Sequence, residues 1–453
     1  MDQVPDAASS LLAFSDVKRR AISSRCYRVK IPTSNGTTFV AGNTMNLDLA
    51  GNMPASYYDF SQSYILATVG NKAPVVVAPG VPGTNNGELC GRSGAYCLID
   101  RFQVITGGQT ISDIQQFNVL ASTLISQNTS YSWGNSVGAN MIGTGTAGTP
   151  HLGATIAEGR ADPLRVALPF ICTSLANTTP ARYIPAFSRD QLRMRIYLAS
   201  NAIAFVSGGA PVMEITEVEA VMYVVELSSD AQALVSAMCG NVFNILCSDY
   251  RTVNGSFTGA AVPLTTTQTL GFAVSSLERI IVVHRRDDAI VQANQAMSRS
   301  LATLNEYQCF INGAAFPERP IVLDGTANLL GYGAEGFAET MVAQHALSDF
   351  GHGSQLNMVG GGLPSVTGLW AIDDGDGSTS AKTGQGVVAI ELESLAGKSN
   401  SLYSGISTIG AVVQYRGVYN APSAVVYNLS FFAQFTSMLS LDMNSLGTYV
   451  VSV

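Results

Sequence analysis

The residues best suited to bind a cation form a short acidic loop. Asp373, Asp374 and Asp376 alternate with glycines and are followed by hydroxyl side chains. Carboxylate oxygens are the ligands that hard cations such as calcium prefer. An EF-hand loop also needs a glutamate at its twelfth position, where this chain has Gln385 or Gly384, depending on the starting aspartate. The EF-hand pattern fails. We interpret the loop as an acidic turn, and a cation site between subunits is the alternative.

The four histidines, His151, His284, His345 and His352, give no recognisable catalytic pattern. A catalytic triad needs a serine or cysteine beside a base, and the sequence pairs none of these histidines with one. The HExxH zinc motif is absent. Residues 284–288 form a charge run, which we interpret as a strand-end turn with local ion pairs. We therefore predict no catalytic residue, no metal site and no cofactor, and a protein that is not an enzyme.

A glycine-rich stretch could in principle hold a nucleotide. Gly143, Gly145 and Gly148 fit the letters of GxGxxG. A dinucleotide site also needs a strand before the motif and a helix after it, and neither is clear here. Residues 127–180 are dense in Gly, Thr, Asn and Ala. We interpret this stretch as a long surface loop or intersubunit tower, because loops of this length are usually functional.

The cysteines suggest neither disulfides nor zinc. Their number is odd, and no CxxC spacing occurs. Cys90 and Cys97 could pair around a turn, but we predict buried free thiols. The seven are Cys26, Cys90, Cys97, Cys172, Cys239, Cys247 and Cys309.

Charge limits the partners of the chain. The formal net charge is −8 and only 12% of residues are charged. Proteins that wrap nucleic acid need basic surfaces to neutralise phosphates. One basic segment exists, around Lys18–Arg20. We interpret it as part of an N-terminal arm that is solvated or contacts other subunits, with packaged nucleic acid as the alternative. No sequence-specific nucleic-acid binding is predicted. Low charge also fits a surface largely covered by neighbouring subunits.

The elements that would carry these residues are mostly strands. Short runs rich in β-branched and aromatic residues recur between Gly, Asn, Pro and Ser, for example at residues 44–49, 193–198 and 306–311. In residues 215–227, Glu217 and Glu219 alternate with apolar residues, as in a strand with one buried face. A chain of 453 residues should form two or three compact units. The pattern favours β-sandwiches or barrels.

The two halves of the chain resemble each other in one segment. Ile99–Ile105 and Leu277–Val283 share the order aliphatic, acid, arginine and then apolar residues. Each half also ends in a long predicted strand, at residues 215–227 and 425–435. A predicted helix at residues 229–238 lies between the halves. These features predict an internal duplication with its junction at that helix.

Several motifs resemble those of double jelly-roll major capsid proteins, most like those of polinton-like viruses and virophages. Residues 93–124 carry a Gly-Ala-x-x-Leu-Ile-x-Arg strand, then Gly-Gly, an acid and Phe-Asn-x-Leu. Residues 306–321 carry Asn-Gly, then Pro, then Pro-Ile. Residues 390–393 and 401–409 resemble a late strand of the family and its Ser-Gly turn. The resemblance touches both halves and roughly 70% of the chain, whereas the stretch around residues 134–150 matches nothing.

The resemblance implies an all-β fold of two consecutive jelly-roll β-sandwiches, with short helices and long surface loops. We expect an N-terminal arm over residues 1–25, a first jelly roll over 26–230 and a second over 231–453. It further implies homotrimers that form pseudo-hexameric capsomers of an icosahedral shell around a DNA genome. Neighbouring capsomers, penton proteins and minor capsid proteins are the expected partners. The expected location is the virion, after synthesis in the host cytoplasm or nucleus.

Other interpretations make distinguishable predictions. A single jelly-roll shell protein with a projecting β-domain would have one jelly roll and usually a basic arm. A secreted sugar-binding sandwich would need a signal peptide or paired cysteines, which the sequence does not show. The host, the shell size, the receptor and the presence of an internal membrane do not follow from the sequence. For subunit contacts we select residues 127–180 and five residues of the arm, Leu11, Leu12, Phe14, Arg19 and Arg20.

Overall fold

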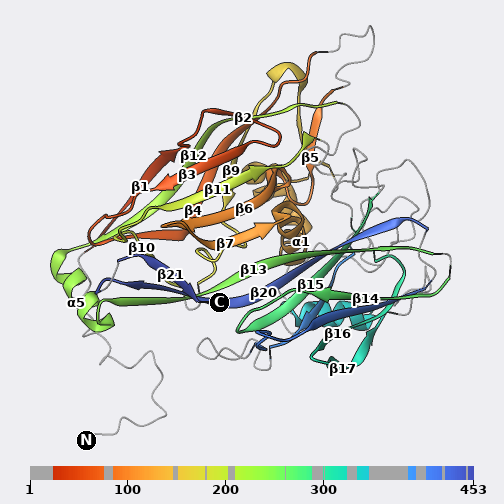
Figure 1. Ribbon diagram of the computed structural model, residues 1–453. Coiled ribbons are helices and arrows are strands. Elements are labelled where there is room, and N and C mark those ends of the chain that lie inside the picture. Colours follow the sequence, from red (N-terminus) through yellow and green to blue (C-terminus); the bar gives the residue numbers. More distant parts are fainter. Residues whose placement is uncertain are drawn as a thin grey trace, which may run out of the picture.

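The computed structural model consists largely of two β-sandwiches that lie against each other (Figure 1). The first is built from the red to yellow-green part of the chain and the second from the green to blue part. The structure describes residues 24–75, 85–145, 152–178, 181–201, 210–260, 262–287, 299, 301–323, 334–345, 386–393, 405–420, 424–444 and 447–452.

The first sandwich has two antiparallel sheets. One has the order β1-β12-β4-β10, with β9 also on β4 and β2 also on β12, and the other has the order β3-β11-β6-β7. Their bounds are Ser24–Pro32 for β1, Thr38–Val40 for β2, Thr44–Leu49 for β3, Ser56–Asn71 for β4, Ile99–Thr106 for β6, Gln109–Gln115 for β7, Leu164–Pro169 for β9, Ile184–Pro185 for β10, Leu192–Leu198 for β11 and Met213–Leu227 for β12.

The second sandwich repeats this arrangement. Its sheets have the orders β13-β20-β15-β18, with β21 also on β20, and β14-β19-β16-β17. The bounds are Val242–Thr258 for β13, Leu264–Leu270 for β14, Leu277–Arg286 for β15, Leu304–Ile311 for β16, Ala314–Val322 for β17, Val388–Glu391 for β18, Val413–Tyr419 for β19, Val426–Asp442 for β20 and Tyr449–Ser452 for β21.

Both sandwiches are jelly rolls. Along the chain, the eight main strands are β1, β3, β4, β6, β7, β9, β11 and β12 in the first sandwich and β13 to β20 in the second. In each sandwich, one sheet contains the first, eighth, third and sixth of these strands, and the other contains the second, seventh, fourth and fifth. This is the arrangement of eight strands in two sheets that defines a jelly roll. The predicted fold class, a double jelly roll with short helices, is confirmed.

The sequence echo, however, matches strands that are not equivalent. Ile99–Ile105 lies in β6, the fourth main strand of the first jelly roll, whereas Leu277–Val283 lies in β15, the third of the second. The strand equivalent to β6 is β16, in the other sheet. The long closing strands β12 and β20 are equivalent, as the sequence suggested. The duplication of topology is therefore real, but the short motif does not mark it.

Alternating burial explains why these residues form strands. In β11, Leu192, Met194 and Ile196 are buried, and the residues between them are partly exposed. This period of two gives each strand one face for the core. In β12 the alternation is interrupted by a bulge, where Glu217 has φ 52° and the pairing with β4 shifts. Glu217 is exposed, and the apolar face predicted around it is buried.

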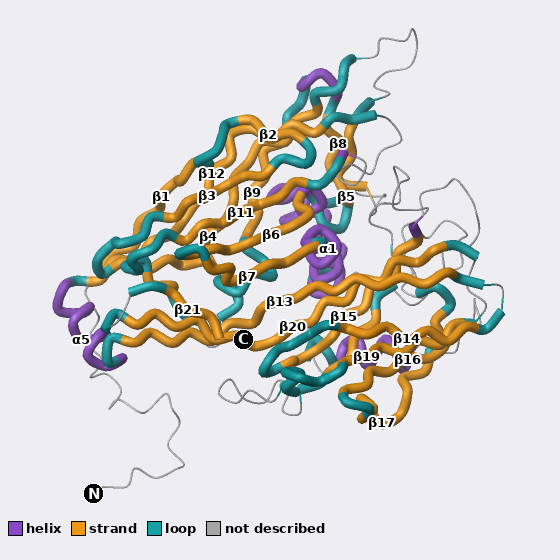
Figure 2. The backbone as a smooth tube through the Cα atoms, viewed as in Figure 1, coloured by secondary structure: helices purple, strands orange, loops and turns teal. Residues whose placement is uncertain are grey.

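The helices are short, and the largest buried one was not expected from the sequence. Helix α1, Phe117–Asn128, follows β7 and is almost entirely buried. Figure 2 shows it, in purple, beside the place where the two sets of strands meet. Helix α5, Ser229–Cys239, begins with Ser228 as a capping side chain and joins the two sandwiches where the sequence placed a helix. Helix α7 covers Ala334–Val342. In the described residues, no helix is long and apolar enough to cross a membrane.

The stretch at residues 127–180 is more regular than predicted. After α1 it forms a helical run consisting of α2, a π-helical turn and α3, followed by strands β8 and β9. Strand β8 pairs with β5 in a separate two-stranded sheet, and β9 joins the first jelly roll. The prediction of a long loop was therefore wrong for these segments, because small polar residues here fill tightly packed elements. The bounds are Gly87–Cys90 for β5, Tyr131–Trp133 for α2, Gly134–Gly138 for the π-helix, Ala139–Ile142 for α3 and Leu152–Ile156 for β8; short 3-10 helices cover Ala95–Leu98 and Glu158–Arg160.

Candidate functional site

The residues selected for chemistry are not gathered into one site. The acidic loop Asp373–Asp376 and the histidines His151 and His352 lie outside the described residues. His284 is completely buried inside β15, and its Nε2 lies 2.9 Å from the Tyr419 hydroxyl. Burial lowers the pKa of His284 to about 3, so the ring is neutral. Among the described residues, no cluster of His, Cys, Asp and Glu is arranged to hold a metal.

The charge run at residues 284–288 is not a turn in its described part. His284 and Arg285 belong to β15 and are buried, and the strand continues to Arg286. Asp287, directly after the strand, accepts a hydrogen bond from Asn428 of β20 at 2.9 Å. The prediction failed because charged residues are rarely buried in a strand, and a sequence pattern does not show that this one enters the junction between the jelly rolls.

One motif escaped the sequence reasoning. Gly134–Gly138 fits the letters of GxSxG, in which a nucleophilic serine stands on a sharp turn between a strand and a helix. Here the segment is a π-helical turn within a helical run. The Ser136 hydroxyl is exposed and donates to the Ser132 carbonyl at 2.6 Å. The surroundings are not those of a nucleophile elbow.

The cysteines behave mostly as predicted. All seven are free, and five are buried. Burial raises the pKa of Cys97 and Cys172, which keeps both as neutral thiols. Cys90 and Cys97 are free and buried, as predicted, whereas Cys26 and Cys239 are exposed, because Cys26 faces outward on edge strand β1 and Cys239 ends the exposed helix α5.

The predicted contact residues of the arm cannot be placed. Leu11, Leu12, Phe14, Arg19 and Arg20 lie outside the described residues. Exposed apolar side chains do occur at the α5 end of the molecule. Leu234 and Met238 on α5 are 59% and 79% exposed, and α5 has no buried residue. Val450 of β21 is 51% exposed. Solvent-exposed apolar side chains of this size suit a contact surface.

The two jelly rolls are joined along strands β7 and β13. The Ser112 hydroxyl on β7 donates to Asp249 on β13 at 2.7 Å, and both side chains are buried. The Thr252 hydroxyl donates to the Gln115 carbonyl at 2.8 Å. Burial raises the pKa of Asp249 to about 7, although its hydrogen bonds from Ser112 and the Tyr250 amide oppose the shift. The centre of the junction is therefore polar and buried, and one oxygen of Asp249 accepts two hydrogen bonds there.

Further contacts join the two jelly rolls at one end of this junction. Near the C-terminus, the rings of Phe187 and Phe243 pack edge to face with centroids 5.1 Å apart. The amide of Arg189 donates to the Gly447 carbonyl at 2.7 Å. In Figure 1 the C-terminal strand β21, in dark blue, returns beside β10 of the first jelly roll. Aromatic packing and backbone hydrogen bonds thus add to the polar centre.

Buried arginines lie on the other side of the junction. Arg299, 1% exposed, donates to the Ser126 hydroxyl of α1 at 2.8 Å. Burial lowers the pKa of Arg285 to about 10, and the charge of Asp100, from the first jelly roll, opposes that shift. Burial raises the pKa of Asp100, and Arg285 opposes it in turn. Contacts at several points along the junction thus join the two jelly rolls.

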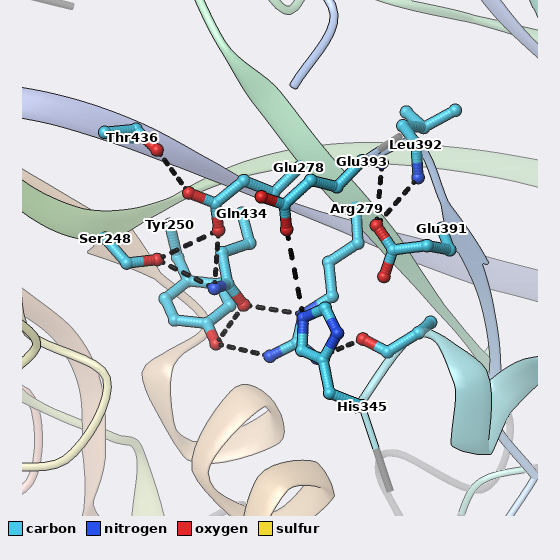
Figure 3. Close-up of polar contacts among 11 residues, drawn as sticks. Ser248, Tyr250, Glu278, Arg279, His345, Glu391, Leu392, Glu393, Gln434 and Thr436 are labelled. Atoms are coloured by element: carbon cyan, nitrogen blue, oxygen red, sulfur yellow. Dashed lines mark hydrogen bonds and ion pairs between the residues drawn. The ribbon is translucent and has the colours of Figure 1, made fainter. Parts of the chain in front are cut away.

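A polar cluster of the second jelly roll borders this junction (Figure 3). Arg279 of β15 stands at its centre, and its Nε donates to Gln434 at 2.6 Å. Its Nη1 donates to the Ala343 carbonyl, and its Nη2 lies 3.5 Å from the Tyr250 hydroxyl. Gln434 donates in turn to Glu278 at 2.8 Å. The guanidinium is thus fixed in orientation by partners on three sides.

Two acidic groups lie at the edge of the cluster. Burial raises the pKa of Glu391 to about 7, and one of its oxygens accepts the Glu393 amide at 2.7 Å. His345 lies 3.9 Å from Glu393, and burial together with the positive charge of Arg279 lowers its pKa. Among the described residues, no serine or cysteine nucleophile is shown beside His345.

A cavity of about 380 Å³ lies between the jelly rolls, next to Arg279. Helix α1 contributes Leu124 and Ile125, and the segment after β9 contributes Phe170 and Ile171. Tyr250 and Arg279 face it from the second jelly roll. Among the described residues that line it, Arg279 is the charged one. The cavity is therefore mainly apolar, and Asn128, Thr129 and Asn177 add polar groups to its lining besides Tyr250 and Arg279.

Comparisons with known proteins agree with this geometry. No family model matches the sequence, and no curated protein matches it. A chain from a quasi-atomic model of the PBCV-1 virus capsid has 12% identity and a TM-score of 0.58, and the match covers 96% of this chain and 98% of that one. The Faustovirus major capsid protein has 7% identity and a TM-score of 0.58, with 93% and 91% covered. A chain from the cryo-EM structure of the Sputnik virophage has 13% identity and a TM-score of 0.53, with 95% and 88% covered.

Likeness at these identities establishes the fold. The described part of the chain has the double jelly-roll fold, and the resemblance predicted from the sequence is confirmed at that level. A single jelly roll with a projecting domain, the alternative, does not describe this structure.

Proposed function

We propose that this chain is a major capsid protein, which assembles as homotrimeric, pseudo-hexameric capsomers into an icosahedral shell around a DNA genome. The observation that carries the proposal is the presence in one chain of two jelly rolls of identical strand order, joined by a buried junction. Three copies of such a unit supply six similar jelly rolls. Threefold symmetry then gives a nearly sixfold outline, and blocks of that shape tile a closed shell.

The domain division supports the same proposal. The sheets of the first jelly roll use strands between residues 24 and 227, and those of the second use strands between residues 242 and 452. These limits are compatible with an arm over residues 1–25 and jelly rolls over 26–230 and 231–453. Under this proposal the arm and the exposed α5 end contact neighbouring subunits, and penton and minor capsid proteins contact the assembled capsomers.

The charge of the chain supports a shell that encloses its genome without binding a particular sequence. A net charge of −8 disfavours binding of phosphates over a large surface. We therefore assign the chain to the virion, after synthesis in the host cytoplasm or nucleus, and give it a structural role in place of an enzymatic one.

The size and outline of the purified particle test the proposal. Light scattering should give about 143 kDa, three times the chain mass of 47.5 kDa, and negative-stain microscopy should show pseudo-hexagonal particles. A stable monomer with affinity for a saccharide would overturn it. Dimers that form small shells would also overturn it and favour a quasi-equivalent assembly.

Charge substitutions at the α5 end test the contact surface. Met238→Lys places a charge at a 79% exposed apolar position of α5, and Ala233→Lys adds the same charge at another exposed position of the same helix. We expect Met238→Lys to raise the protein concentration at which trimers dissociate into monomers at least tenfold. Ala233→Lys should dissociate at nearly the same concentration as the unaltered chain. Equal behaviour of the two variants would remove α5 from the proposed contacts. Leu11→Asp and Phe14→Asp test the arm in the same assay.

A further inference from the structure

We infer that the cavity between the jelly rolls binds a single-chain amphiphile with a carboxylate head, such as a medium-chain fatty acid. The alkyl chain would lie against α1 and the segment after β9, and the carboxylate would meet Arg279. This inference concerns a small-molecule site and does not depend on the proposed assembly, because the cavity lies within one chain.

The size of the cavity sets the length of the ligand. An apolar cavity of about 150 Å³ holds benzene, which has six carbon atoms. In proportion, the volume of about 380 Å³ takes roughly 15 non-hydrogen atoms. Dodecanoate has about 14 such atoms and matches this volume. A phospholipid is several times too large, and a metabolite of a few atoms would leave most of the apolar wall without contacts.

The walls favour an alkyl chain. Tyr96, Ile125 and Phe170 are 3%, 7% and 7% exposed, and each lines the cavity. Trp133 and Met141 continue the lining along the helical run after α1. Water binds weakly to walls of this kind, because it finds few hydrogen-bond partners there. Ligand pockets are typically of this kind, apolar with a few polar groups that fix orientation.

The polar end favours a carboxylate. A guanidinium has five N–H donors, and the described partners of Arg279 take three of them, at Gln434, Ala343 and Tyr250. Among the described residues, the other two donors have no partner. They lie on a group that already faces the cavity and is held in orientation, so little entropy is lost on binding. The positive charge opposes an ammonium head at the same position.

The ligand would also connect the two jelly rolls. Its chain would contact the first, through Leu124 and Ile125 of α1, and its head would contact the second, through Arg279 of β15. A ligand that binds only the folded, joined state stabilises that state by mass action. Saturating dodecanoate should therefore raise the temperature of cooperative unfolding.

Calorimetric titration of the purified full-length chain tests the site. The probes are dodecanoate, dodecanol and dodecylamine, each below its micellar concentration. We expect one dodecanoate per chain, bound at least tenfold more tightly than dodecanol and more tightly still than dodecylamine. Binding of none of the three would overturn the inference. Equal affinity for dodecanoate and dodecanol would overturn the assignment of the head to Arg279, and this comparison requires no variant to fold.

A filled cavity provides the matched control. Leu124→Trp enlarges a side chain that lines the cavity, and Leu234→Trp makes the same change on α5, where the side chain is 59% exposed. We expect Leu124→Trp to weaken dodecanoate binding tenfold or more while the stoichiometry and affinity of Leu234→Trp remain unchanged. Unchanged binding by Leu124→Trp would place the amphiphile elsewhere and overturn the inference. The trimer mass, measured on the same samples, reports separately on the assembly proposal.

Discussion

The two jelly rolls have the same strand order but stabilise it differently. The first carries ion pairs between neighbouring strands on its solvent-facing side. Arg193 contacts Asp48 at 2.5 Å, Arg101 contacts Asp113 at 2.6 Å and Lys30 contacts Glu219 at 2.7 Å. In each pair both side chains keep partial exposure. These pairs help to set strand register from outside the core.

The second jelly roll places polar aromatic groups inside its core. His284 and Tyr419 are both completely buried and lie within hydrogen-bond distance. The ring of Tyr419 packs on Phe257 with centroids 4.4 Å apart, and Tyr415 packs on Phe431 at 5.3 Å. The comparison shows that strand order requires a pattern of burial but not particular side chains. A duplicated topology can therefore persist with little sequence repetition.

The largest expected effect comes from emptying either core. Phe431→Ala in the second jelly roll and Phe102→Ala in the first each remove a ring that is at most 2% exposed. Each should lower the free energy of unfolding by about 3–5 kcal/mol, because a buried phenylalanine leaves a cavity. The measurement is urea unfolding followed by circular dichroism.

The number of transitions decides whether the jelly rolls are independent. Because the junction is extensive, both variants should shift one common transition by similar amounts. Val426→Ala, on the same strand as Phe431 but 39% exposed, is the control and should change little. Two separate transitions, each sensitive to one variant only, would show that the two jelly rolls unfold independently and would contradict this expectation.

Local pattern was enough to predict most strands and the helix between the halves. Strands β3 and β11 alternate buried and partly exposed residues, which a sequence shows directly. Helix α1 was missed because it is buried on nearly all sides, so its sequence lacks the alternation of an amphipathic helix. The bulge at Glu217 was also missed, since it depends on pairing with β4.

The junction could not be predicted for a different reason. Ser112 and Asp249 are 137 residues apart, and nothing near either residue signals that they meet. The cavity combines residues from α1 with Arg279 of β15, at similar separation along the chain. The acidic loop and the end of the glycine motif, which did have local patterns, lie outside the described residues. In this fold the functional surfaces arise from long-range packing, so motifs were informative mainly through the family resemblance.

The next largest effect is expected at Asp249, in the polar centre of the junction between the two jelly rolls. The pKa of Asp249 is raised from 3.8 to about 7, so the folded protein binds a proton that the unfolded chain releases. Stability contributed by this group is complete below about pH 4 and is lost as pH rises through about 7. Asp249→Asn removes this dependence. The difference in free energy of unfolding between the variant and the unaltered chain should change by about a few kcal/mol at most between pH 5 and pH 8.

Unfolding in urea at several pH values measures this difference. Asp162→Asn changes an exposed carboxylate of the first jelly roll and is the control, for which we expect no comparable dependence. An Asp249→Asn profile parallel to that of the unaltered chain would show that Asp249 does not titrate within the junction.

A smaller effect is expected from the buried histidine pair. Tyr419→Phe removes the hydroxyl that lies 2.9 Å from His284 Nε2 and leaves a buried ring nitrogen without that partner. The cost should be about 1–3 kcal/mol, the typical penalty for an unsatisfied buried group. Tyr183→Phe, in the first jelly roll and 52% exposed, should change little under the same unfolding assay. A neutral Tyr419→Phe would mean that the contact with His284 adds nothing to the stability of the second core.

The smallest effect should come from the surface pairs of the first jelly roll. A double-mutant cycle with Arg193→Gln and Asp48→Asn isolates the coupling energy of a pair whose side chains are 43% and 21% exposed. We expect about 0.2–1 kcal/mol, because water and salt screen such pairs. The hydrogen bond from Arg193 lowers the pKa of Asp48, so this contribution should disappear as pH falls through that lowered pKa. In the second jelly roll, Arg416 and Glu306 lie 3.6 Å apart, and their coupling should be smaller still. A coupling energy that molar salt leaves undiminished would mean that these ion pairs are not screened surface contacts. The contrast between surface ion pairs in the first jelly roll and a buried aromatic core in the second would then be wrong.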